Sequence, residues 1–441
     1  MDAAYKKNPV DKNRKLPTDD EQTELFEYIV DNLGEYTEML FSEDLQIIEE
    51  SLDWFIETFK TIEYMFEDKI LIRLMNLLQN YDDPIKQKTI NVLKNIIKFE
   101  SVMQDTLVEN GFLDFMFQNY SPELLSLFYL LSSSNGKYRS ILIENGYIEH
   151  IQSMFETETP PYVLARLCFS LVNKKIEYEQ VNGQKIFTLF QQLLNYLSDD
   201  QSCFNIIRSF LHLLGSNDNF VLAFLHFDML KPFIELQTNN EDYLLSLFDM
   251  LIFICNFNEE SARYLLDNQV IEFVHFFLND EYQDLLISKA IDLLSDLSFY
   301  IPEAIGMIYD AQLTIDIIDI FYNNSNAGLL KSVVHFCIIS MALASPMLYW
   351  CLYQQGCYTI IVDSVNIIDE IDIRWALRII RKGFANGKPD IIDKLRLFLS
   401  ENSEFIEWLE MLRASDDGEL REAGESLLNQ IYPENPVYVT Y

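Results

Sequence analysis

The side chains that could support catalysis or bind a metal ion are spread along the chain instead of being grouped in motifs. The five histidines lie far apart, and none has a second candidate ligand at the spacing of a metal site. The six cysteines lie in apolar stretches without a Cys-x-x-Cys pair, which is typical of small buried side chains. The sequence contains no phosphate-binding glycine loop, no Gly-x-Ser-x-Gly and no His-Glu-x-x-His. We therefore predict a non-enzymatic protein that needs no cofactor and no metal ion.

Acidic residues dominate the charged side chains. The chain of 441 residues has 69 Asp and Glu against 32 Lys and Arg, a formal net charge of −37. With so many carboxylates, some lie close together by chance, so their proximity does not indicate acid–base catalysis. The negative potential repels nucleic acid and anionic membranes and attracts basic protein segments. We therefore expect protein partners that offer basic, extended segments; an acidic surface that only keeps the protein soluble is the alternative.

The elements that must position any binding residue follow from two markers that recur about every 42 residues. Polar breaks such as NYDDP at 80–84 and QTNNED at 237–242 separate apolar stretches with helical spacing. Between the breaks lies a short turn, seen as ENG in TLVENGFLDF at 106–115 and in ILIENGYIEH at 141–150. The turn positions taken as equivalent are Asn110, Asn145, Asn268, Ala311 and Gln354. Two markers with one period predict stacked helical repeats, because each unit must bury its apolar face on its neighbours.

Three regions follow from this organisation. Residues 1–20 are predicted to be a basic, disordered N-terminal arm, and residues 433–441 a C-terminal tail. Between them, residues 21–432 are predicted to form an all-α solenoid of about eight to nine repeats. Asn-Gly in the turns supplies the left-handed conformation that ends a helix without strain.

The repeat resembles a known family. Its period, its turn of the form Val/Ile-x-x-Gly-x-Ile/Leu and the helix that follows look like armadillo repeats. The stretch EMLFSEDLQIIEESLDWFIETF at 38–59 resembles the first repeat of importin-α, whose pattern is kept by Ser42, Glu43, Asp44, Gln46, Glu50 and Phe55. This resemblance to a divergent importin-α (karyopherin-α) implies a right-handed solenoid of armadillo or HEAT type. It also implies an adaptor that captures nuclear-localisation segments of cargo in an acidic concave groove, in the cytoplasm and nucleus.

The resemblance also assigns candidate peptide-binding residues. Importin-α proteins line their groove with Trp-Ala-Leu-x-Asn, in which the amide binds the peptide backbone and the indole flanks a lysine stem. This chain keeps fragments of that motif: Asn95 in NVLKNI, Asn256 in IFICNF and Trp375 in RWALRII, while Asp296 in LLSDL offers a counter-charge. The other repeats have Ser or apolar residues at the corresponding places. An ordinary helix-surface amide and a packed aromatic ring are the alternatives for these residues.

The N-terminal arm has the opposite sign to the rest of the chain. Its first fifteen residues have a net charge of +3, contributed by Lys6, Lys7, Lys12, Arg14 and Lys15 against two aspartates. The resemblance to importin-α implies that such an arm binds an importin-β-like carrier and folds back into the groove as an autoinhibitory mock cargo. A disordered solubilising tail is the alternative.

Two other functions stay open at this point. The first is a generic armadillo or HEAT scaffold for a folded protein partner, with no role in import. The second is a membrane-associated helical protein that uses residues 332–362, which contain no Asp, Glu, Lys or Arg. Against membrane insertion, Pro346 near the middle of that segment and the Gln-Gln-Gly turn at 354–356 favour two helices of the repeat. The start of the chain has no apolar segment of the signal-peptide kind, so we expect no export.

Overall fold

The computed structural model describes residues 19–59, 67–99, 101–118, 122–134, 136–172, 180–198, 202–279, 281–368 and 370–433. The chain divides into two compact units, residues 1–190 and residues 191–441. Within the described ranges every regular element is helical, which confirms the predicted all-α class. The predicted basic arm lies almost wholly outside the described residues, since helix α1 begins at Asp19.

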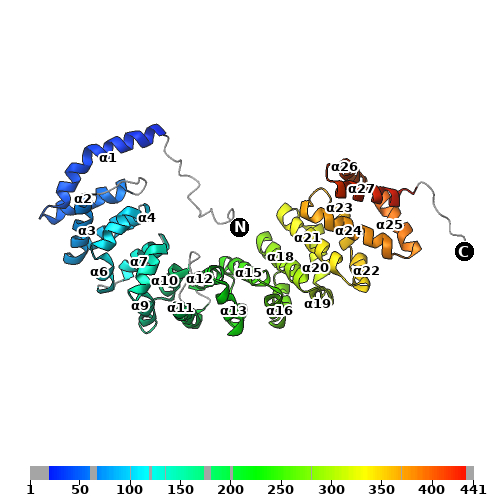
Figure 1. Ribbon diagram of the computed structural model, residues 1–441, viewed down its shortest axis with the longest axis horizontal. Coiled ribbons are helices and arrows are strands. Elements are labelled where there is room, and N and C mark those ends of the chain that lie inside the picture. The colour runs from blue at the N-terminus through cyan, green and yellow to red at the C-terminus, as the bar shows by residue number, and fades with distance from the viewer. Residues whose placement is uncertain are drawn as a thin grey trace. The chain divides into compact units, whose positions relative to one another are not determined.

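In the first unit, long helices follow one another as neighbours. Helix α4 packs on α2 and on α7, and α7 packs on α10, while shorter helices fill the remaining places (Figure 1). The buried side chains of these helices recur at spacings of three and four residues, as in Leu124, Leu127 and Phe128 of α7. The helices are α1 Asp19–Leu40, α2 Leu45–Thr58, α3 Asp68–Asn80, α4 Ile85–Phe99, α5 Ser101–Glu109, α6 Phe112–Gln118, α7 Pro122–Ser134, α8 Gly136–Glu144, α9 Tyr147–Met154 and α10 Pro161–Val172, followed by α11 Gln180–Leu193, which crosses into the second unit.

In the second unit the repeat is clearer. Groups of three helices end in a long third helix, and the third helices α12, α15, α18, α21 and α24 pack successively on one another (Figure 1). Each group therefore buries its apolar face on the next, as the period of the sequence predicts. The elements are η1 Leu194–Tyr196, α12 Ser202–Ser216, α13 Asp218–His226, α14 Lys231–Ile234, α15 Glu241–Cys255, α16 Glu259–Asp267, α17 Val270–His275, α18 Asp284–Tyr300, α19 Ala304–Asp310, α20 Leu313–Asn323, α21 Ala327–Leu343, α22 Pro346–Gln355, α23 Cys357–Asp363, α24 Glu370–Asn386, α25 Pro389–Glu401, α26 Ser403–Arg413 and α27 Gly418–Ile431.

The predicted turns have a common backbone conformation. The residue after four of the five turn markers has a positive φ, which is the left-handed region, and near the fifth marker the residue with a positive φ is Gly356. These residues are Gly111, Gly146, Gln269, Gln312 and Gly356. The alignment of Gln354 with the other markers was wrong by one residue, because Gln355 is the residue that precedes Gly356. Asp228, with a φ of 50°, makes a further such turn that has neither Asn nor Gly to reveal it.

The uncharged segment 332–362 is divided among three helices. It covers most of α21, and then α22, which Pro346 begins, and α23, which Gly356 separates from α22 with a φ of 112°. In the part of the chain that the structure describes, no helix is both long enough and apolar enough to span a membrane. Five of the six cysteines are buried, as predicted, and Cys351 is half-buried.

The segment that resembles importin-α, residues 38–59, contains the start of α2. The Asp44 side chain accepts a hydrogen bond from the backbone N–H of Gln46 at 2.9 Å, and the Asp44 N–H donates to the Ser42 hydroxyl at 3.0 Å. Ser42 and Asp44 therefore cap the N-terminus of α2 by satisfying donors that the helix cannot. Phe55 is fully buried in the same helix.

Candidate functional site

Two predicted binding residues of the second unit are in direct contact. Asn256 caps the C-terminus of α15, and its amide Nδ2 donates to Oδ2 of Asp296 on α18 at 2.7 Å. The Tyr300 hydroxyl lies 3.4 Å from the carbonyl oxygen of Asn256, one turn beyond Asp296. The pair joins two adjacent third helices, α15 and α18, and leaves Oδ1 of Asn256 available as an acceptor.

The carboxylates on α18 are partly withdrawn from water. Asp292 lies one turn before Asp296, and burial raises the pKa of both side chains. Hydrogen bonds from Asn256 to Asp296 and from Ser332 to Asp292 offset only part of this effect. The nearby ammonium group of Lys289 lies 2.6 Å from Oδ1 of Asp249, so it is already engaged.

The polar contacts continue from α18 to α21 and α24. Nδ1 of His335 on α21 lies 2.9 Å from Oδ2 of Asp372 on α24, and Asp372 is 8% exposed. This hydrogen bond raises the pKa of His335, and the negative charges of Asp292 and Asp296 act in the same direction. We call this set, which runs across four successive third helices, the acidic ladder: Asn256, Asp292, Asp296, His335 and Asp372.

Trp375 follows Asp372 by three residues on α24. Its ring is half-buried, and the guanidinium carbon of Arg378 lies 5.4 Å from the ring centroid. One face of the indole, which the resemblance assigns to a lysine of the bound peptide, is therefore in contact with a cation of the same chain. Three of the four predicted residues, Asn256, Asp296 and Trp375, thus lie on or beside the acidic ladder.

The fourth predicted residue, Asn95, belongs to the first unit. It is half-buried on α4, and its Nδ2 donates to the carbonyl oxygen of Ile56 on α2 at 3.2 Å. Its amide therefore links two packed helices and keeps one acceptor for a ligand. The predicted autoinhibitory residues Lys6, Lys7, Lys12, Arg14 and Lys15 lie outside the described residues.

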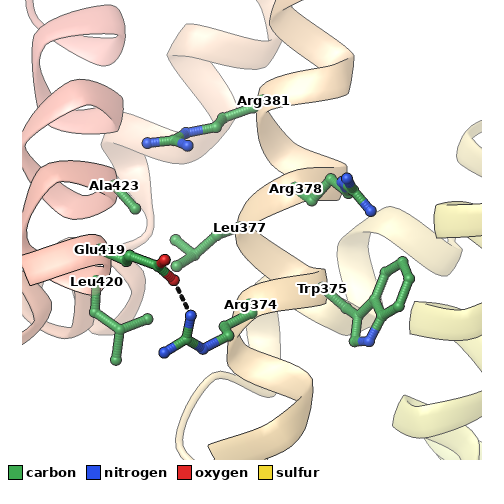
Figure 2. A pocket seen from close by; sticks show the side chains of 8 residues that line it. All are labelled: Arg374, Trp375, Leu377, Arg378, Arg381, Glu419, Leu420 and Ala423. Atoms are coloured by element: carbon green, nitrogen blue, oxygen red, sulfur yellow. Dashed lines mark hydrogen bonds and ion pairs between the residues drawn. The ribbon is translucent and has the colours of Figure 1, made fainter. Parts of the chain in front are cut away.

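Sequence reasoning missed a second feature of the second unit, a pocket of about 890 Å³ between α24 and α27. Figure 2 shows Arg374, Leu377 and Arg381 on the side of α24 that faces α27, with Trp375 on the opposite side. Arg374 pairs with Asp417 at 2.8 Å and with Glu419. The available signal was the spacing of Arg374 and Arg381, seven residues apart, which places two basic groups on one side of a helix in a very acidic chain.

Comparison with known proteins supports the fold. No family model matches the chain, and no curated protein matches it. An engineered protein whose crystal structure came from a structural genomics consortium is 14% identical, with a TM-score of 0.66 over 90% of this chain and 98% of that chain. At this identity the likeness extends to the fold alone.

Two designed armadillo repeat proteins are also similar to part of the chain. One is 19% identical, with a TM-score of 0.46 over 56% of this chain and 99% of that chain. The other, solved in complex with the peptide (KR)4, is 17% identical, with a TM-score of 0.45 over 56% of this chain and 98% of that chain. In the ranges that the structure describes, no three His, Cys, Asp or Glu side chains are grouped so as to hold a metal ion.

Proposed function

We propose that the protein is a non-enzymatic adaptor that binds a basic, extended segment of a partner protein along the acidic ladder. The observation that carries this proposal is the state of Asp292 and Asp296. Burial raises the pKa of both, yet within the described residues neither carboxylate forms an ion pair. A lysine or arginine from a partner would supply the missing charge at a place that water solvates poorly.

The ladder also offers hydrogen bonds with the spacing of helical repeats. Asn256 keeps Oδ1 to accept from a peptide N–H, and its Nδ2 contact holds the side chain in one orientation. Because the attraction is largely between charges, the affinity should fall as salt is added. The generic alternative, a scaffold for a folded partner, would use the same surface without a requirement for lysines.

The finer form of the proposal concerns nuclear import. The likeness of residues 38–59 to importin-α, together with the fragments at Asn95, Asn256 and Trp375, supports capture of nuclear-localisation segments. It further supports an importin-β-like carrier that engages the basic arm, and a location in both cytoplasm and nucleus. Deleting residues 1–20 should strengthen peptide binding if the arm occupies the ladder.

Fluorescence anisotropy with a labelled lysine-rich import-signal peptide tests the proposal. We expect the double variant Asp292→Asn/Asp296→Asn to weaken binding at least about tenfold, equivalent to roughly 1.4 kcal/mol. The matched control, Asp310→Asn/Asp319→Asn, removes the same charge from exposed positions on α19 and α20 and should leave binding nearly unchanged.

If the two double variants lose the same amount of affinity, the peptide responds only to the net charge of the chain. That result would contradict the proposal. A scrambled peptide of the same composition distinguishes a general adaptor for basic segments from an adaptor for nuclear import. If it binds as well as the import signal, the adaptor function survives and the import role does not.

A further inference from the structure

A second surface of the last repeats is rich in arginine. The pocket of about 890 Å³ between α24 and α27 adjoins another of about 630 Å³, and Arg381 lines both. The charged residues that line the two pockets are four arginines and two glutamates: Arg374, Arg378, Arg381, Arg396, Glu419 and Glu422. We call this surface the arginine cleft. Its lining has more arginines than glutamates, although Asp417 and Asp393 pair with two of the arginines, in a chain whose net charge is −37.

Two of these arginines form no ion pair with the residues that the structure describes. Arg374 is paired with Asp417 and Glu419, and Arg396 lies 3.2 Å from Asp393. By contrast, Arg381 forms no ion pair within the described residues, and the contact recorded there for Arg378 is with the Trp375 ring. Figure 2 shows Arg381 extended on the side of α24 that faces α27. An unpaired guanidinium beside a pocket in an acidic protein is a group for which a partner can supply the anion.

We propose that the arginine cleft binds a short, acidic, extended segment of a partner protein. Guanidinium groups bind carboxylates through two parallel hydrogen bonds, which suits Asp and Glu side chains. Between the arginines, Leu377, Leu420 and Ala423 provide an apolar floor for the side chains that alternate with the carboxylates.

The dimensions and the charge both favour such a segment. From Arg374 to Phe384 the helix rises about 15 Å, which matches four or five residues of extended chain. Nucleic acid is a poorer occupant, because its dense backbone charge is repelled by a protein with a net charge of −37. Arg374, Leu377 and Arg381 face α27, whereas Trp375 and Arg378, which also line the pocket, lie on the opposite side of α24 (Figure 2). The proposal rests on the arginines and not on the carboxylates of the acidic ladder, so it does not depend on the binding of basic segments.

The test uses the full-length protein and a fluorescent eight-residue peptide of alternating Glu and Leu. We expect saturable binding that is lost when Gln replaces Glu in the peptide. The variant Arg378→Gln/Arg381→Gln should weaken binding at least about tenfold. Both side chains are exposed, so the variant should keep the far-ultraviolet circular dichroism and melting temperature of the parent. The variant Arg378→Lys/Arg381→Lys, which keeps the charge but loses the forked geometry, should show an intermediate affinity.

The control variant is Lys231→Gln/Arg263→Gln, which removes two exposed cations from α14 and α16. It should bind the Glu-Leu peptide as the parent does. Equal binding of the Glu and Gln peptides, or equal losses in the two double variants, would overturn the proposal. Tighter binding of a single-stranded oligonucleotide than of the Glu-Leu peptide would overturn the choice of partner. Sedimentation that shows self-association abolished by Arg378→Gln/Arg381→Gln would instead assign the cleft to a second copy of this chain.

Discussion

Helix α24 separates two polar surfaces that are built in different ways. On the side of α21, Asp372 is buried and is held by His335, within a ladder in which Asp292 and Asp296 form no ion pair among the described residues. On the side of α27, Arg374 is paired, but its side chain is 55% exposed, and the neighbouring Arg381 is exposed as well. The packing positions between them, such as Ile379 and Ile380, are fully buried. The charged side chains on the surface of a repeat can therefore change from acidic to basic at a few positions while the buried core stays the same.

The contrast is also one of solvation. Charges withdrawn from water interact strongly with whatever is near them, whereas exposed ion pairs contribute little to stability because water and salt screen them. The acidic ladder should therefore respond strongly to single substitutions and to pH. The arginine cleft should respond mainly through its ligand.

The largest effect is expected from the contact between Asp372 and His335. Asp372→Ala removes the acceptor of a part-buried hydrogen bond and should lower the free energy of unfolding by about 2 kcal/mol. Arg374→Ala breaks two exposed ion pairs and should cost less than about 1 kcal/mol. Asp417 still caps α27 in that variant through the N–H groups of Glu419 and Leu420. Urea unfolding followed by circular dichroism measures both, and equal losses would show that burial does not distinguish the two surfaces.

The next effect is a difference in pH dependence between the two surfaces. His335 faces Asp372 from α24 and Asp292 and Asp296 from α18, and its pKa is raised above the ordinary value of 6.5. As the pH rises through that raised pKa, the ladder loses a positive charge. The affinity for a lysine-rich peptide should then increase between pH 6 and pH 8 by roughly three- to tenfold, on the order of 1 kcal/mol. The arginine cleft should bind the Glu-Leu peptide equally over the same range, because guanidinium groups stay protonated.

The same titration sets the sign of a stability effect. A histidine whose pKa is raised in the folded state stabilises the fold fully below its unfolded pKa and loses that contribution as the pH rises through the folded pKa. His335→Gln should therefore flatten both the stability and the peptide-affinity profiles. A profile that keeps its shape in this variant would assign the dependence to another group.

Much of this architecture could be predicted from the sequence, because a solenoid repeats its local rules. The turn markers predicted the residues with a left-handed backbone conformation at Gly111 and Gly146, because Asn-Gly is typical of that conformation. The turn at Asp228 was missed because a non-glycine residue can adopt the same φ when the surrounding packing requires it. Ser42 and Asp44, which support the resemblance to importin-α, serve as a helix cap, a role that any solenoid could need.

The candidate site was only partly predictable. Asn256 and Asp296 lie about one period apart, so equivalent positions on adjacent third helices suggest a contact, and the structure places them 2.7 Å apart. His335 and Asp372 lie 37 residues apart, and register alone does not show which way their side chains turn. The arginine cleft was missed because a net charge of −37 averages over the chain and hides three arginines on one helix. The binding roles of Asn95, Asn256, Asp296 and Trp375 stay predictions.

The smallest expected effect is a change in the free energy of unfolding that should be a gain in the acidic ladder and not in the arginine cleft. Burial raises the pKa of Asp292, so its ionised form disfavours the folded state, and stability falls as the pH rises from the unfolded pKa through the folded one. At pH 7 the variant Asp292→Asn should therefore have a free energy of unfolding about 0.5 kcal/mol higher than that of the parent. The substitution removes the buried charge, and the amide oxygen still accepts a hydrogen bond from Ser332. In the arginine cleft, Glu419→Gln should give no gain, since it only weakens an exposed pair with Arg374. Urea unfolding at pH 7 and at pH 4 tests the reasoning, because the gain from Asp292→Asn must shrink at the lower pH. If the free energy of unfolding increases by the same amount at pH 7 and at pH 4, packing and not the buried charge of Asp292 determines the stability at this position.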